Sequence, residues 1–209
     1  MNLGEMLSAF VTLLLVIDPI GLAPIFVAMT QGRGNAQRRA IAFRACAIAA
    51  GILTLFGVFG TAVLDLMGIS LPAFRIAGGL LLFLIAVEML FERRSQRREG
   101  RTADEDHDPS VFPLATPLIA GPGAMATMIL LASAKGAGWA DKLQAHIALF
   151  AVIGLVLGLF LIAGPIERAL GRTGIVVVTR LLGMLLGALA VQFVLDGLAD
   201  LGLLGAPKG

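Results

Sequence analysis

Asp18-Pro-Ile-Gly-Leu-Ala-Pro24 interrupts an apolar block that runs from about Leu3 to Thr30. A proline inside a helix removes one backbone hydrogen bond and clashes with the preceding turn, so this stretch predicts a broken helix. The apolar stretches on either side, Met6–Ile17 and Ile20–Met29, would be about 18 and 15 Å long as helices. Together they match the ~30 Å of hydrocarbon in a bilayer. We therefore expect a membrane span with its break near the midplane.

The rest of the chain repeats this pattern of long apolar blocks. Of its 209 residues, 58% are apolar and 14% are charged, whereas soluble domains average ~45–50% and ~25%. The further blocks cover about 40–66, 73–91, 111–134, 143–166 and 175–201. These blocks predict an all-α polytopic membrane protein with six transmembrane helices. Residues 1–5 lack the basic region of a signal peptide, so we expect the first block to be retained as a span.

A second proline–glycine segment, Pro113-Leu-Ala-Thr-Pro-Leu-Ile-Ala-Gly-Pro-Gly123, lies inside the fourth block. Its Pro117 and Pro122 repeat the spacing of Pro19 and Pro24 at an offset of 98 residues. Irregular backbone inside a membrane is tolerated only where it is buried in protein or lines a wet cavity. We therefore predict that helices 1 and 4 are both discontinuous and that their breaks meet at the centre. The alternative is that the prolines only kink the helices for packing.

The two halves of the chain resemble each other beyond these prolines. Block three opens with Arg75-Ile-Ala-Gly78 and block six with Arg180-Leu-Leu-Gly183. We divide the chain into a first three-helix repeat (1–91), a polar loop (92–110) and a second three-helix repeat (111–209). Because each repeat has an odd number of spans, the two would lie inverted in the membrane, which is typical of secondary transporters.

Lys and Arg predict the orientation. The first, third and fifth loops hold eleven of them, and the remaining loops and the two termini hold three. The positive-inside rule therefore places loops 31–39 and 92–110 in the cytoplasm and both termini in the periplasm, with the chain in a bacterial inner membrane. The eleven serve as topology signals, and we expect no nucleic-acid partner; they are Arg33, Arg38, Arg39, Arg44, Arg93, Arg94, Arg97, Arg98, Arg101, Arg168 and Arg172.

Asp18 is the most informative candidate for a site. An ionisable group near the midplane is costly and marks an ion or substrate path. Asp18 is interpreted either as a coupling site or ligand for a cation or ammonium, or as an N-cap before a proline at the first helical position. Both roles are compatible.

Half-helix ends at the breaks would offer N–H groups to a carboxylate and carbonyls to a cation. The predicted substrate-binding residues are Asp18, Pro19, Gly21, Pro24, Thr116, Pro117, Gly121, Pro122 and Gly123. Three further residues have two possible roles each. Arg75 and Arg180 either line a cavity at the breaks or anchor the span ends. Gln192 either lines this cavity or makes an interhelical hydrogen bond. Gly154-x-x-x-Gly158 and Gly183-x-x-x-Gly187 predict close-packing helix faces.

Residues needed for other chemistries are missing. Cys46 is the only cysteine, so a disulfide relay or a cysteine metal pair is excluded. An aspartyl intramembrane protease needs two facing aspartates, but Asp18 has no partner in the second repeat, where Ala124 follows Gly121-Pro-Gly123. No nucleotide-binding motif is present either, which argues against an ATP-driven pump. We expect no enzyme activity, no metal and no cofactor other than a coupling ion, H⁺ or Na⁺.

The motifs Asp18-Pro-Ile-Gly-Leu-Ala-Pro-Ile-Phe26 and Pro113-Leu-Ala-Thr-Pro-Leu-Ile-Ala-Gly-Pro-Gly-Ala124 resemble those of the MarC (UPF0056) family of six-span bacterial inner-membrane proteins, over essentially the whole chain. The resemblance implies a fold like that of the lysine-exporter superfamily and transport of glycine, alanine or similar small zwitterionic solutes. The family often has Asn where Asp18 stands, so the charge of the site stays open.

The leading hypothesis is therefore a secondary transporter of small neutral amino acids with H⁺ or Na⁺ coupling. The alternatives are a passive small-solute channel and an intramembrane enzyme. Substrate identity, coupling ion, direction and homo-oligomeric state are left open by the residues.

Overall fold

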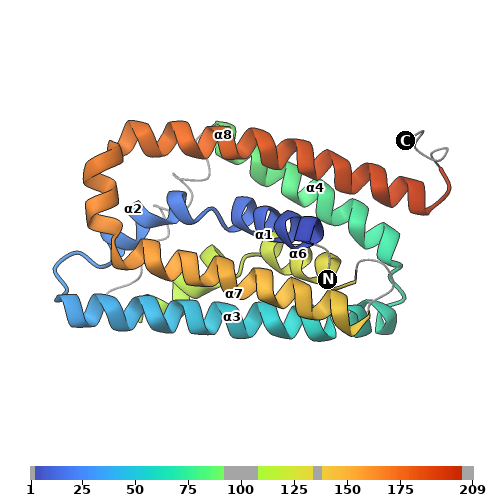
Figure 1. The fold of residues 1–209 in the computed structure, drawn as a ribbon, viewed down its shortest axis with the longest axis horizontal. Helices are drawn as coiled ribbons and strands as arrows, with labels where there is room; N and C mark the ends of the chain where they lie inside the picture. The colour runs from blue at the N-terminus through green and yellow to red at the C-terminus, as the bar shows by residue number, and fades with distance from the viewer. Residues whose placement is uncertain (1–2, 92–107, 134–137, 204–209) are drawn as a thin grey trace.

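The computed structural model describes residues 3–91, 108–133 and 138–203, and every regular element in these ranges is a helix. The helices lie roughly along the long axis of an elongated bundle (Figure 1). In chain order they are α1 (Leu3–Ile17), α2 (Pro19–Met29), α3 (Asn35–Leu66), α4 (Leu71–Leu90), η1 (Ser110–Ile119), α6 (Pro122–Ala132), α7 (Trp139–Leu161) and α8 (Ala163–Asp200).

Five stretches in the described part of the chain are long and apolar enough to cross a membrane: Leu3–Met29, Asn35–Leu66, Leu71–Leu90, Lys142–Leu161 and Thr173–Asp200. The bent pair η1–α6 makes a sixth if it is one span. Large apolar side chains such as Phe43, Phe59 and Leu84 point outward from these helices, as lipid-facing positions require. The prediction of an all-α, multi-pass membrane protein is confirmed.

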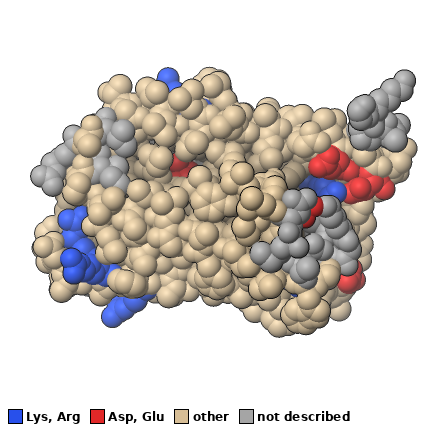
Figure 2. Space-filling view, viewed as in Figure 1, with Lys and Arg blue, Asp and Glu red and all other residues tan. Residues whose placement is uncertain are grey.

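Charged side chains gather at the two ends of the bundle. On the face drawn in Figure 2, most Lys and Arg lie at the end where α3 and α8 begin, and Asp and Glu cluster at the opposite end. The surface between them is almost free of charge. Charges are excluded from hydrocarbon and tolerated at headgroups, so the long axis of the bundle runs across the membrane.

The segment between the last two spans differs from the predicted loop. The blocks 143–166 and 175–201 placed a connection between them, but α8 begins at Ala163, immediately after the end of α7. The helical path is interrupted at Gly171, whose φ of +63° lies in the left-handed region. Glycine adopts this conformation without steric cost, so the chain changes direction there and continues as a helix on both sides.

Glycines bring α4 and α8 into close contact. A Cβ placed on Gly79 would lie 2.8 Å from the carbonyl oxygen of Ala190, and one on Gly183 would lie 2.8 Å from the Cβ of Met89. Small residues allow such backbone approach between membrane helices, which confirms the packing face predicted at Gly183. The prediction for Gly154 and Gly158 is wrong, because a Cβ at either position meets no described atom within 4 Å.

Gly79→Leu is expected to destabilise the protein. The new side chain has no room against the backbone of α8, and overpacking of this kind costs about 1–3 kcal/mol. Gly154→Leu is the matched control, since the same substitution there projects into open space. Thermal unfolding of both variants in the same detergent checks the prediction. Equal melting temperatures would contradict the close packing of α4 on α8.

Candidate functional site

Asp18 lies between α1 and α2 in a left-handed conformation, with φ 55° and ψ 65°. Its Oδ1 accepts a hydrogen bond of 3.1 Å from the backbone N–H of Gly21, so Asp18 is the N-cap of α2. Pro19 follows at the first helical position, where a missing N–H costs little. Only 1% of Asp18 is exposed. The capping role is thus present in the structure, and the coupling role stays a prediction.

The first break, at Asp18, leaves Leu3–Met29 as one candidate span, and its geometry depends on Gly21. Asp18 belongs to both helices: its N–H donates to the carbonyl of Leu14 at the end of α1, and its carbonyl accepts from the N–H of Leu22 at the start of α2. The Asp18 side chain folds back over Gly21, where a Cβ would lie 2.8 Å from the carboxyl carbon. Gly21 therefore leaves the space that the Asp18 carboxylate occupies. Pro24, inside α2, is half-buried.

The second break is sharper. The axes of η1 and α6 differ by 56°, and the wide helical turns of η1 are interrupted by extended backbone at Phe112 and Thr116. Gly121 caps α6 without a side-chain hydrogen bond, and Pro122 is the first residue of the helix. A Cβ on Gly121 would lie 2.6 Å from the carbonyl oxygen of Pro117, so the tight turn before α6 requires glycine.

Asp108 anchors the start of η1. Its carboxylate accepts a hydrogen bond of 3.0 Å from the N–H of Ser110 and forms an ion pair of 2.8 Å with Arg44 of α3. The Ser110 N–H, and to a lesser extent the Arg44 guanidinium, hold the pKa of Asp108 below its ordinary value of 3.8. The carboxylate is therefore charged at neutral pH and ties the beginning of the second half to α3.

The two breaks lie close to each other in the bundle core. A Cβ on Gly123, in the first turn of α6, would be 3.4 Å from Val16 of α1 and 3.4 Å from Leu82 of α4. Val16 is two residues before Asp18, so the end of α1 and the beginning of α6 are in contact. Of the predicted site residues, Asp18, Pro19, Gly21 and Gly123 are buried, Pro24, Thr116, Pro117 and Gly121 are half-buried, and Pro122 is exposed.

One buried hydroxyl beside the breaks was missed by the sequence reasoning. Thr127 is one helical turn beyond Gly123, and residues four apart share a helix face. Its Oγ1 is fully buried and has no hydrogen-bond partner among the described residues. Buried polar groups without a partner are rare and call for an explanation. In the sequence, only the four-residue spacing between Gly123 and Thr127 indicates that Thr127 lies on the same helix face as the second break.

Arg75 and Gln192, two of the remaining candidate residues, have contacts elsewhere. Arg75, near the start of α4, forms an ion pair of 2.6 Å with Asp200 at the end of α8. Gln192 is exposed and donates a hydrogen bond of 2.7 Å to Asp196 on the same helix. Arg180 is exposed on α8. Arg75 therefore joins the ends of α4 and α8, and Gln192 bonds within its own helix.

A family model described as "MarC family integral membrane protein" matches residues 3–201 of the chain. The chain belongs to the MarC family. This MarC chain is 39% identical to a UPF0056 membrane protein of Archaeoglobus fulgidus over 92% of both chains. It is 37% identical to the UPF0056 membrane protein YvbG of Bacillus subtilis, over 95% of this chain and 96% of YvbG.

Another relative is the UPF0056 inner membrane protein YhgN of Escherichia coli, 34% identical over 94% of the MarC chain and 97% of YhgN. No solved structure matches the chain. The expected family resemblance is thus confirmed across nearly the whole length.

The chemistry available at the breaks of this MarC protein is that of a carboxylate, a hydroxyl and helix ends. In the part of the chain that the structure describes, no group of three His, Cys, Asp or Glu residues could hold a metal ion. Asp18 offers carboxyl oxygens, Thr127 offers a hydroxyl, and the first turn of α6 offers backbone N–H groups that no side chain caps. Such a set suits a small dipolar molecule.

Proposed function

We propose that this protein is a secondary transporter of small neutral amino acids, with its binding site between the two breaks. The observation that supports the proposal is the close approach of Gly123 of α6 to Val16 of α1, two residues before the buried Asp18, at the ends of two interrupted spans. Interrupted spans that meet inside the bilayer are the common construction of transporter binding sites.

The packing of the helices supports an inverted repeat of two three-helix units, in the manner of the lysine exporters. In such a repeat α1–α2 corresponds to η1–α6, α3 to α7 and α4 to α8. Both α3 with α7 and α4 with α8 are packed pairs, and in Figure 1 each pair lies side by side along the bundle. A two-fold axis between the halves would bring corresponding helices together in this way.

The site is complementary to a zwitterion. The N–H groups at the start of α6 would receive the carboxylate of the solute, because helix N-termini favour anions. The Asp18 carboxylate would face the ammonium group or a coupling cation, H⁺ or Na⁺. Thr127 would supply a hydrogen bond. In this arrangement Asp18 keeps its capping role and contributes the charge that the second break lacks.

The charge distribution supports the orientation given by the positive-inside rule. The basic end of the bundle, where α3 and α8 begin (Figure 2), would face the cytoplasm, and the termini would face the periplasm of the bacterial inner membrane.

Counterflow in proteoliposomes tests the function. Vesicles loaded with unlabelled glycine or alanine are expected to accumulate the labelled amino acid transiently and saturably, and an imposed H⁺ or Na⁺ gradient should drive uptake. Protein-free vesicles are the control. A passive channel would equilibrate the label without counterflow. Failure of the whole panel of small neutral amino acids to show counterflow or gradient-driven uptake would overturn the proposal.

A further inference from the structure

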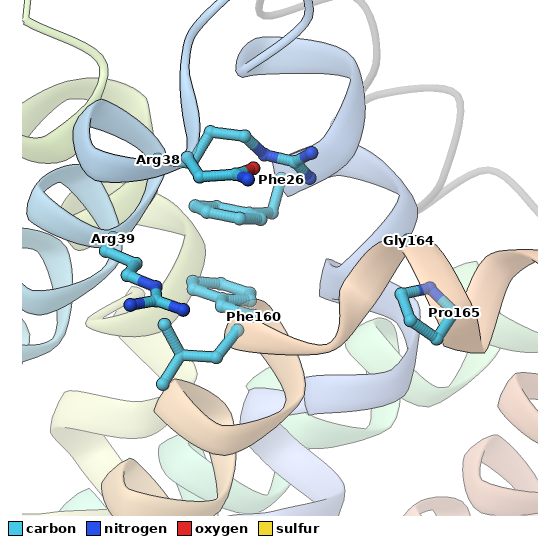
Figure 3. Close-up of a pocket in the computed structure, with 8 residues that line it drawn as sticks. Phe26, Arg38, Arg39, Phe160, Gly164 and Pro165 are labelled. Carbon is cyan, nitrogen blue, oxygen red and sulfur yellow. The ribbon is translucent and has the colours of Figure 1, made fainter.

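A cavity of about 310 Å³ lies away from the breaks, at the end of the bundle where α3 and α8 begin (Figure 3). We call it the basic cavity. It is lined by Phe26 of α2, by Asn35, Arg38 and Arg39 of α3, by Phe160 and Leu161 of α7, and by Gly164 and Pro165 of α8. Four helices therefore converge on it, and its lining comes from two segments that are far apart in the sequence, 26–39 and 160–165.

The wall of the basic cavity is a pair of stacked rings. Phe26 and Phe160 are parallel to within 6°, with their centroids 4.4 Å apart, and both are about 1% exposed. The guanidinium carbon of Arg38 lies 5.9 Å from the centre of the Phe26 ring, a distance suited to a cation–π contact. Arg39 reaches toward Phe160 in Figure 3. The rings thus hold one guanidinium over an apolar surface.

The positive charge of the basic cavity is not balanced within the described residues. None of its eight lining residues is acidic. Among the described residues, neither Arg38 nor Arg39 is a member of an ion pair. A topology signal requires only that arginines lie on one side of the membrane. It does not require two of them to line one cavity beside an aromatic stack.

We propose that the basic cavity binds the carboxylate or phosphate group of a small organic anion. Arg38 and Arg39 would receive the anionic group, since guanidinium donors match the geometry of carboxylate and phosphate oxygens. The Phe26–Phe160 pair would contact the apolar part of the ligand. The volume lies near the lower limit of small-molecule pockets, ~300–1,000 Å³, so the ligand is a small anion or the headgroup of an anionic lipid. This site is independent of the proposed transport site.

The test is a binding measurement on the full-length protein in a neutral detergent, by isothermal titration with inorganic phosphate and with benzoate. The double variant Arg38→Gln/Arg39→Gln is expected to weaken binding of both probes at least about tenfold, because it removes two charge-assisted contacts. Arg33→Gln is the matched control, since Arg33 is exposed and lies outside the cavity. It should change affinity less than about twofold. An unchanged melting temperature shows that each variant is folded.

A second arm separates a soluble anion from a lipid. The same variants are placed in nanodiscs of phosphatidylcholine with or without phosphatidylglycerol. Stabilisation by phosphatidylglycerol that disappears in the double variant assigns the cavity to an anionic headgroup, and binding of phosphate or benzoate in detergent assigns it to a soluble anion. Either result supports the proposal. The proposal is overturned if the double variant behaves like the wild type, or if no probe and no anionic lipid has an effect.

Discussion

Gly21→Ala is expected to reduce transport at least about tenfold and to lower the stability of the protein by about 1–3 kcal/mol. The added methyl group would occupy the space of the Asp18 carboxylate, whose Cγ lies 2.8 Å from the position of the new Cβ. The carboxylate must therefore rotate away, which breaks its hydrogen bond to the Gly21 N–H. The variant loses the N-cap of α2 and misplaces the charge of the site. Initial rates of glycine counterflow and thermal unfolding measure the two effects.

The matched control for Gly21→Ala is Gly51→Ala on α3. Gly51 is exposed, and a Cβ at that position meets no described atom within 4 Å. Alanine is favoured over glycine inside a helix by about 1 kcal/mol, so this variant should be as stable as the wild type or more so. If Gly21→Ala were equally well tolerated, the close contact between Gly21 and Asp18 would be disproved.

Asp18→Asn is expected to keep the fold and lose ion-driven accumulation. Asparagine caps helices as well as aspartate does and also tolerates the left-handed conformation. Stability should therefore change by less than about 0.5 kcal/mol. If Asp18 carries the coupling charge, gradient-driven uptake should fall at least about tenfold, whereas counterflow, which needs no ion gradient, should continue. Uptake is followed in proteoliposomes with an imposed H⁺ or Na⁺ gradient.

Asp18→Ala separates the two roles of Asp18. Alanine has no capping oxygen and pays a steric cost in the left-handed region, so the loss of stability should reach about 1–3 kcal/mol. Both variants should lose coupling, but only the alanine variant should lose stability. If Asp18→Asn shows wild-type accumulation with the same pH dependence, Asp18 acts as a cap and not as a coupling group.

The helices could be predicted from the sequence because hydropathy is a local property. The first block, from about Leu3 to Thr30, corresponds to α1 and α2, and the block at 73–91 corresponds to α4. The cap at Asp18 was also predictable, because an N-cap depends only on the next three residues. The change of direction at Gly171 could not be predicted, because the sequence does not show whether a glycine ends a helix or only interrupts it.

The contacts between distant residues could not be predicted in the same way. Arg38 and Arg39 were interpreted as topology signals, and nothing near them in the sequence indicates the Phe26–Phe160 stack that makes them a cavity wall. The motif Gly154-x-x-x-Gly158 has the right spacing for packing but lies on a face that meets no described neighbour. The spacing of small residues shows that a neighbouring helix could pack closely there. Only the tertiary arrangement determines whether a neighbouring helix lies against that face.

The pairing of α4 with α8 has a consequence for biosynthesis. Gly79 is made about 110 residues before Ala190, the backbone it packs against, which at ~5–20 residues per second is a delay on the order of 5–20 s. During that time α4 has entered the membrane without the helix that covers its glycine face. Arg75 also lacks its ion-pair partner, Asp200, until the end of α8 is made. The nascent first half therefore relies on lipid or on the insertion machinery to shield this face until the last helix arrives.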